Sequence, residues 1–318
     1  MSAPSQGPFL GVDIGGTKVA VGIVNRDGKI LVQGRKPMVA NGTAEAGLEA
    51  VISAIDLMMS QGPIQSIGIC APGPLDPKTG VVLNPPNVPC WRNFALAEKV
   101  AAKYNVPVKV DNDANAAALA ETRWGAARGY HYVFYATVGT GIGSGIVLDG
   151  KIYHGNTGSA GEGGHVSIDY RGPVCACGKR GCIEVLASGT AIGARAREKL
   201  AAETSRRSAM LDLAKSIDSV TSETVAQAFA SGDPLATEIL QETVDLLVAW
   251  LGNIVDLLDP DVLVMGGGVA AVLKPFFGDI KKRLPTWCVN PCAAEIPLLM
   301  AHYGADAGIA GGAALCAE

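Results

Sequence analysis

Residues 161–184, GEGGHVSIDYRGPVCACGKRGCIE, bring one histidine and three cysteines close together in the sequence. His165, Cys175, Cys177 and Cys182 offer one nitrogen and three thiolates, which is the ligand set of a closed tetrahedral zinc site. Four protein ligands leave no coordination position for water, so the pattern predicts a structural zinc ion rather than a catalytic one.

Two other interpretations of these cysteines are less favoured and stay open. A disulfide would leave one of the three cysteines unpaired and would need an oxidising compartment. A nucleic-acid-binding zinc finger usually has wider C-x₂₋₄-C spacing and a second pair of ligands. The net charge of −4 also gives no basic footprint for a phosphate backbone, so we expect no nucleic-acid partner.

Two glycine-rich turns have the composition of phosphate-binding loops. DIGGTK (13–18) and TVGTGIGSG (137–145) place glycines where two expected strands reverse. Glycine allows backbone N–H groups to approach an anion closely, and Thr17, Lys18 and Thr140 add further donors for a polyphosphate. The alternative is a pair of tight hairpins without a ligand. Neither turn fits the Walker or dinucleotide patterns, because no helix follows directly.

A carboxylate stands at a second position suited to chemistry. In VDNDANAAALAE (110–121), the end of an expected strand delivers Asn112 and Asp113, and a helix starts at once. Ligands of open α/β sheets bind at such strand ends. Asp or Asn at a helix start is also a common N-cap, so both interpretations remain open for these residues.

The elements that must position these residues alternate between strands and helices. A glycine-rich stretch at 265–270 follows a buried strand and could carry a nucleotide base or ribose. The hairpin at 9–25 recurs about 120 residues later at 132–148, which indicates a duplicated domain. Hydrophobic patterning predicts strands at 9–14, 19–25, 30–36, 66–70 and 106–111, and a hairpin of two strands within 132–148. It predicts helices at 44–60, 94–104, from 112, 186–200 and 234–258.

Composition agrees with a globular α/β enzyme. The chain has 318 residues, 48% of them hydrophobic, with 40 glycines and 18 prolines, and its length predicts two domains. Residues 1–8 lack the pattern of a signal peptide, and no apolar run is long enough for a membrane span. We therefore expect a cytoplasmic protein that does not bind a membrane.

Several motifs in order resemble the ROK family (repressors, open reading frames, kinases), and within it the sugar kinases of glucokinase type. They are DIGGTK, APGP, NPPNVPCW, DNDANAAALAE, TVGTGIGSG, AGEGGH and CACGKRGCIE, and together they run from Gly11 to about Gly312. The last of them is the most specific. The resemblance implies an actin/hexokinase-type α/β fold, with two ribonuclease-H-like domains and a cleft between them.

The resemblance also implies the roles of individual residues. Asp113 would be the catalytic base, and Asp13 would lie near the Mg²⁺ that accompanies ATP. Predicted sugar contacts are Gly73, Asn87, Asn112, Asp113, Glu162, His165 and Glu184. Predicted nucleotide contacts are Gly11, Asp13, Gly15, Gly16, Thr17, Lys18, Gly139, Thr140, Gly141, Gly143, Gly267 and Gly268.

Zinc would then order the two loops that carry Glu162 and Glu184 and so support the sugar pocket. We expect the phosphate turns, distant from the zinc site in this interpretation, to keep their ATP affinity when zinc is lost.

The predicted activity is phosphorylation of a hexose by ATP, with glucose as first choice. Kinases for N-acetylglucosamine, N-acetylmannosamine or fructose share these motifs, and a sugar-responsive repressor of the same family is a more distant alternative. A homodimer is the expected assembly. The expected domains are a small one of residues 1–116 with 303–318, and a large one of residues 117–302 that carries the zinc site.

Overall fold

The computed structural model describes residues 7–203 and 206–317. Contacts divide them into two compact units. The first unit contains the described residues up to Tyr135, together with Gly145–Gly161 and those from Ala301 onward; the second contains Ala136–Ser144 and Glu162–Met300. No helix among the described residues is long and apolar enough to cross a membrane.

The first unit is built on a five-stranded sheet. Its centre is β1, which pairs antiparallel with β2 on one side and parallel with β4 on the other. The strands stand in the order β3 (Ile30–Pro37), β2 (Lys18–Val24), β1 (Phe9–Ile14), β4 (Ser66–Ala71) and β8 (Val108–Asn112). These bounds agree closely with the strands predicted from hydrophobic patterning.

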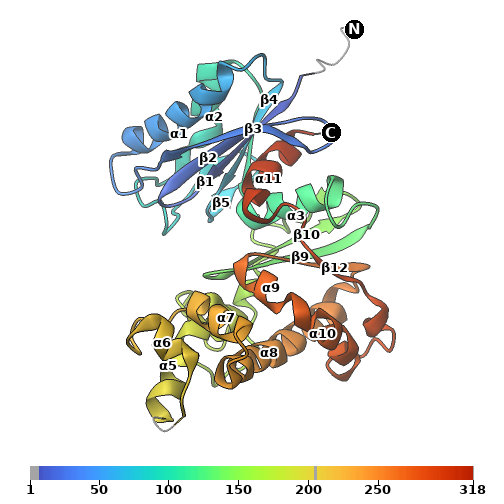
Figure 1. Cartoon of the computed structure of the whole chain (residues 1–318). Helices are drawn as coiled ribbons and strands as arrows, with labels where there is room; N and C mark the ends of the chain where they lie inside the picture. The colour runs from blue at the N-terminus through green and yellow to red at the C-terminus, as the bar shows by residue number, and fades with distance from the viewer. Residues whose placement is uncertain (1–6, 204–205, 318) are drawn as a thin grey trace. The chain divides into compact units, whose positions relative to one another are not determined.

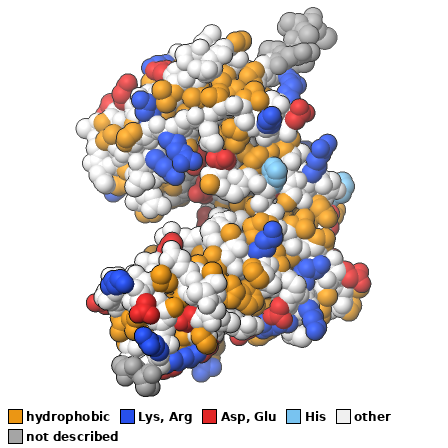
Figure 2. Space-filling view, viewed as in Figure 1, with side chains coloured by type: hydrophobic (Ala, Val, Ile, Leu, Met, Phe, Trp, Pro, Cys, Tyr) orange, Lys and Arg blue, Asp and Glu red, His pale blue; other side chains and the backbone are white. Residues whose placement is uncertain are grey.

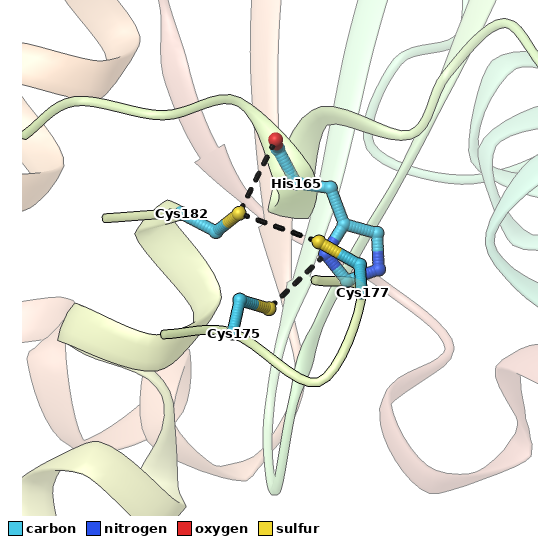
Figure 3. Close-up of side chains that lie close together, drawn as sticks. All are labelled: His165, Cys175, Cys177 and Cys182. Atoms are coloured by element: carbon cyan, nitrogen blue, oxygen red, sulfur yellow. Dashed lines mark hydrogen bonds between the residues drawn. The ribbon is translucent and has the colours of Figure 1, made fainter. Parts of the chain in front are cut away.

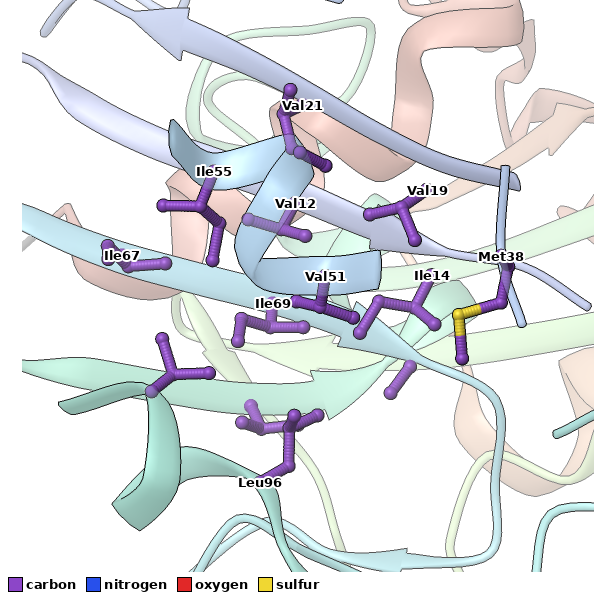
Figure 4. Packing of buried hydrophobic residues seen from close by; sticks show 14 of the residues in the cluster. Val12, Ile14, Val19, Val21, Met38, Val51, Ile55, Ile67, Ile69 and Leu96 are labelled. Atoms are coloured by element: carbon purple, nitrogen blue, oxygen red, sulfur yellow. The ribbon is translucent and has the colours of Figure 1, made fainter. Parts of the chain in front are cut away.

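One face of this sheet packs on helix α1 (Ala44–Met59), and helix α2 (Leu96–Tyr104) joins the same core. Figure 4 shows Val12 and Ile14 of β1 pointing toward Val51 and Ile55 of α1. Thr43 is the N-cap of α1, and its side-chain hydroxyl accepts the N–H of Ala46.

The other face of the sheet packs on the last helix, α11 (Ala307–Cys316), beside α3 (Asp113–Arg123). Figure 1 shows α11, in red, against the blue N-terminal strands. Backbone meets backbone here, because a Cβ atom on Gly11 would collide with the carbonyl of Ile309, and one on Gly68 with that of Gly312. Glycine on both strands therefore lets α11 approach the sheet closely.

A second five-stranded sheet repeats this arrangement. Its order is β11 (Lys151–Ile152), β10 (Ile142–Leu148), β9 (Tyr132–Val138), β12 (Val262–Gly266) and β13 (Leu298–Met300). In each sheet the first three strands in sequence form a meander, and the fourth stands beside the first strand on its other edge. The shared order confirms the duplication predicted from the two hairpins.

Helices make up most of the second unit. The longest, α8 (Pro234–Leu258), has the bounds predicted from its apolar periodicity. The helix predicted at 186–200 is instead divided at Ser188, whose side chain caps the second part by accepting the N–H of Ala191. The remaining helices are α4 (Ile183–Ala187), α5 (Gly189–Ala202), α6 (Ala209–Ala214), α7 (Ser222–Ala230), α9 (Gly268–Leu273) and α10 (Phe277–Arg283).

The structure groups residues 117–135 with the first unit, whereas the sequence interpretation assigned them to the second domain. Residue 116 lies inside α3, and this helix packs as one body against α11. The same packing brings Ala301 and His302 into the first unit. Whether either unit is an independent domain stays a prediction.

On the face shown in Figure 2, Lys and Arg side chains are interspersed with Asp and Glu side chains. This mixture agrees with the small net charge of −4.

Candidate active site and metal centre

The first glycine turn connects β1 to β2. It is closed by the N–H of Gly15, which donates to the carbonyl of Lys18 at 2.9 Å. Thr17 and Lys18 are exposed, so their donors are available to an anion. A Cβ atom on Gly16 would lie 2.8 Å from the carbonyl oxygen of Asn87. The structure therefore brings a predicted sugar contact, Asn87, next to a predicted phosphate turn.

Asp13, at the end of β1, is the first of two carboxylates in this unit. Burial, and after it the negative charge of Asp113, raise the pKa of Asp13 to about 6, although Lys18 and Arg35 act in the opposite direction. Two carboxyl groups that repel each other in a poorly hydrated place are suited to a cation or to proton transfer.

Asp113, the first residue of α3, is the second carboxylate. Its side chain reaches solvent, yet the surrounding protein displaces enough water to raise its pKa. The helix is capped instead by Asn112, whose Oδ1 accepts the N–H of Ala114 at 2.9 Å and that of Asn115 at 3.4 Å. Asn112 fills the N-cap position, and Asp113 Oδ1 also accepts the N–H of Ala114, at 2.8 Å. The capping interpretation therefore applies first to Asn112, while the second carboxylate oxygen of Asp113 takes no part in this contact.

The backbone of Asn112 is held by Asp111, which in turn contacts His154. This pair was not identified from the sequence. Asp111 Oδ1 accepts the backbone N–H of Asn112 at 2.7 Å and the side-chain amide of Asn115 at 3.2 Å. Its Oδ2 lies 2.6 Å from Nε2 of His154. No role was assigned to His154 from the sequence, and this pair joins residues 43 positions apart in the sequence.

Glu121 is a further residue that the sequence did not reveal. Its fully buried carboxylate accepts the backbone N–H groups of His302 and Tyr303 at 2.7 and 3.0 Å, and that of Ala126 at 2.8 Å. Glu121 thereby fastens α3, which begins at Asp113, to the segment that leads into α11.

Other predicted residues of the first unit have identifiable surroundings. A Cβ atom on Gly73 would lie 3.5 Å from Nδ2 of Asn112, so this backbone is close to a predicted sugar contact. Gly11 lies within β1 under the carbonyl of Ile309, which gives it a packing reason of its own.

In the second unit, the four predicted metal ligands come together. Their ligand atoms all lie within 4.8 Å of one another (Figure 3). Cys175 Sγ is 3.7 Å from His165 Nδ1, and Cys177 Sγ is 3.6 Å from Cys182 Sγ. With zinc–sulfur bonds of about 2.3 Å, tetrahedral geometry separates two sulfur ligands by about 3.8 Å. One nitrogen and three sulfur atoms at these distances fit a zinc ion.

The thiols of this cluster differ in acidity. The backbone N–H of Lys179 lowers the pKa of Cys177, whereas burial and then the neighbouring thiols raise the pKa of Cys182 to about 12. All eight cysteines are free, so the disulfide interpretation is not supported.

Both predicted sugar-binding glutamates adjoin this cluster. Glu162 is exposed, and its carbonyl accepts the N–H of His165 at 3.0 Å. Glu184 Oε1 lies 3.9 Å from His165 Nδ1, and its Oε2 accepts the N–H of Ile142 at 2.9 Å. The sequence interpretation placed the glutamates here but did not foresee the bond to Ile142.

The second glycine turn connects β9 to β10 and carries Thr140 on an exposed position. Gly139 donates its N–H to the carbonyl of Gly141 at 2.9 Å and accepts the N–H of Gly189 at 2.7 Å. The glycines predicted near a nucleotide base lie beside it, because a Cβ atom on Gly267 would collide with the carbonyl of Val138.

The predicted site residues thus form two groups, one in each unit. The first holds one glycine turn, Asp13 and four predicted sugar contacts, Asp113 among them. The second holds the other turn, the metal cluster and two glutamates.

Comparisons with known proteins identify the family of this chain. The sequence pattern of the ROK family matches residues 9–318. The chain belongs to the ROK family. It is 34% identical to a glucokinase of Thermotoga maritima, over 98% of this chain and 97% of the relative. It is 33% identical to an N-acetylmannosamine kinase of Shigella boydii, over 96% of this chain and 97% of the relative.

Among solved structures, it is similar to a ROK family glucokinase from Streptomyces griseus in complex with glucose and AMPPNP. The TM-score is 0.83 at 35% identity, over 97% of this chain and 99% of that chain. The fold of this ROK chain is therefore the actin-like, two-sheet α/β fold of the family's sugar kinases.

Proposed function

We propose that this ROK protein is an ATP-dependent hexose kinase that forms glucose 6-phosphate and ADP from glucose and ATP. The relatives named as sugar kinases, and the solved relative that holds glucose and AMPPNP, support the activity. Within this chain the proposal rests on Asp113, an accessible carboxyl group directly after the end of a strand. The N-cap position of the helix that begins there is filled by Asn112.

The chemistry follows from these positions. A sugar hydroxyl is a weak nucleophile, so it must be held in line with the γ-phosphoryl group and lose its proton as the new bond forms. Asp113 accepts that proton, and its raised pKa makes it a better base than an ordinary aspartate. Asn87, Asn112 and Glu162 hydrogen-bond the sugar hydroxyls and so orient the reacting one.

The two glycine turns bind the phosphates. Lys18 and the hydroxyls of Thr17 and Thr140 supply donors, together with backbone N–H groups. Asp13 would hold Mg²⁺, and the ion would neutralise charge on the phosphates. Gly267 and Gly268 support the rest of the nucleotide.

The decisive experiment replaces Asp113 with asparagine. Asp113→Asn should keep the fold and sugar binding but lower kcat by about 10² or more, since it removes the general base. Asp212→Asn, on an exposed position of α6, is the matched control. Near-normal kcat in Asp113→Asn, measured by coupled ADP release, would falsify the assignment.

The identity of the sugar is tested separately. Kinetics with glucose, fructose, N-acetylglucosamine and N-acetylmannosamine should give the highest kcat/KM with glucose. A preference for an acetylated sugar would instead place the chain with relatives such as the N-acetylmannosamine kinase. A DNA-shift assay at moderate salt tests the repressor alternative, for which we expect no binding.

We also propose a structural zinc ion at His165, Cys175, Cys177 and Cys182, since their chemistry and separations fit that metal. A homodimer in the cytoplasm is the remaining part of the proposal. Sedimentation and cell fractionation test it.

A further inference from the structure

Glu184 connects the metal cluster to the second glycine turn. Its two carboxylate oxygens face in different directions. Oε1 lies 3.9 Å from Nδ1 of His165, while Oε2 accepts the backbone N–H of Ile142 at 2.9 Å. Ile142 is the first residue of β10, directly after the turn that carries Thr140. One side chain therefore spans the distance from a metal ligand to a phosphate-binding loop.

The segment that carries His165 also packs against β10, the strand that follows this turn. Gly163 donates its N–H to the hydroxyl of Ser144 at 2.8 Å, and its carbonyl accepts the indole N–H of Trp250 at 3.1 Å. A Cβ atom on Gly164 would collide with the carbonyl of Ile142. The metal-binding segment and β10 are thus in direct backbone contact.

The turn itself has the shape needed to receive Glu184. A Cβ atom on Gly141 would lie only 2.5 Å from Oε2 of Glu184, whereas one on Gly139 would meet nothing within 4 Å. Helix α5 also contacts this turn, because Thr190 Oγ1 donates to the carbonyl of Thr140 at 2.9 Å. The position of the turn therefore depends on both Glu184 and the start of α5.

We propose that Glu184 is a positioning residue through which metal occupancy sets the geometry of the second phosphate turn, so that the metal, the sugar and the nucleotide are energetically coupled. The inference rests on the proposed kinase function. It replaces the expectation that nucleotide affinity is independent of zinc.

The direction of the coupling follows from the contacts. A bound metal fixes Cys182, two residues before Glu184 in the sequence, and His165, whose Nδ1 lies 3.9 Å from Glu184 Oε1. Without the metal these loops are free to move, and the bond from Ile142 to Glu184 is held less firmly. A phosphate-binding turn loses affinity when its N–H groups are no longer preorganised. Losing the metal should therefore weaken nucleotide binding as well as sugar binding.

The first experiment measures nucleotide affinity in the absence of sugar. The full chain is titrated with AMPPNP and Mg²⁺ by calorimetry, once as purified with metal and once after chelation and removal of the chelator. We expect affinity about tenfold weaker in the stripped protein, the scale of one hydrogen bond to a charged group. Restoring zinc should restore it. Equal affinity in both forms would overturn the proposal.

The second experiment compares two variants in one turn. Gly141→Ala should displace Glu184 and weaken glucose affinity, measured without nucleotide, by about tenfold. Gly139→Ala, which meets no neighbour, should leave glucose affinity unchanged. Identical glucose affinities for the two variants would refute the coupling, while the kinase function would stand. If wild-type protein binds no hexose at all, the proposed function fails instead.

A pair of substitutions at Glu184 covers the case in which Gly141→Ala fails to fold. Glu184→Gln keeps an oxygen that can accept the N–H of Ile142, whereas Glu184→Ala does not. AMPPNP affinity should therefore fall more in Glu184→Ala than in Glu184→Gln. Equal affinity in the two variants would show that the bond to Ile142 does not position the turn.

Discussion

Nε2 of His154 lies 2.6 Å from Oδ2 of Asp111. The other carboxylate oxygen of Asp111 accepts the backbone N–H of Asn112, a proposed sugar contact. The Asp111 side chain is almost fully buried, while His154 is about one-third exposed. The hydrogen bond to Asp111 raises the pKa of His154, although desolvation and the positive charge of Lys78 act against it.

The pair predicts a pH-dependent contribution to stability. A histidine with a raised pKa in the folded state stabilises the fold fully below its unfolded pKa of about 6.5 and loses this contribution as the pH rises through the folded value. The unfolding free energy of wild type should therefore exceed that of His154→Gln most at about pH 6, and the difference should shrink toward pH 9. Urea unfolding at several pH values measures it.

His131 provides the control, because it pairs with Asp149 at 3.0 Å on an exposed surface. His131→Gln should change stability by less than about 1 kcal/mol at any pH. A stability difference for His154→Gln that is the same at every pH would contradict the assigned role.

Two carboxyl groups with raised pKa values predict an acid limb in the pH profile of the rate. The pKa of Asp13 is raised to about 6 and that of Asp113 is also raised, so both lose their charge at a higher pH than ordinary aspartates. In the free enzyme, kcat/KM should fall as the pH drops through about 6. Activity recovered after preincubation at low pH would separate this effect from unfolding. A profile that is flat down to about pH 4.5, near the ordinary range of carboxyl groups, would argue against it.

Gly308 offers a way to move Asp13 without touching it. A Cβ atom on Gly308, in the first turn of α11, would collide with the carboxyl carbon of Asp13. Gly308→Ala should therefore displace this carboxylate and lower kcat/KM for Mg²⁺–ATP by about tenfold to a hundredfold. Glucose affinity without nucleotide should change little. Gly278→Ala, in α10 with nothing within 4 Å, is the matched helical control and should behave as wild type.

Metal analysis tests the cluster directly. Purified protein should contain one zinc per chain, and Cys177→Ser should lose it and unfold at a lower temperature, because thiolate ligands couple metal binding to folding. Cys292→Ser is the control, since that cysteine is also exposed but lies outside the cluster. Retention of a full zinc equivalent by Cys177→Ser would show that the ligand set is different.

Strong local patterns made much of the fold predictable. Alternating or continuous apolar runs marked the strands at 9–14 and 66–70, and helical spacing marked α8. Helix α11 gave no such signal: its sequence AGIAGGAALC is nearly all small or apolar, because the helix is surrounded by other elements rather than half exposed. The short strands β5 (Leu75–Asp76), β6 (Val81–Val82) and β7 (Phe94–Ala95) were too brief to predict.

The candidate site divides in the same way. Ligand chemistry was enough to select His165 and the cysteines, because zinc requires particular atoms. Two hydrogen bonds join residues far apart in the sequence: the N–H of Ile142 donates to Glu184, and the N–H of His302 donates to Glu121. Nothing in local composition reports such contacts, which only the packed chain creates.

The position of α11 also bears on the order in which the protein folds during synthesis. This helix covers the face of β1 that holds Gly11 and Asp13, yet the ribosome makes it nearly three hundred residues later. At translation rates of about 5–20 residues per second, that delay is on the order of tens of seconds. All residues of the second unit have been synthesised before those of α11. The first sheet, by contrast, lacks the helix that covers one of its faces until α11 has been made. The carboxylate proposed to hold the metal–nucleotide complex is therefore among the last parts of the molecule to reach its final surroundings.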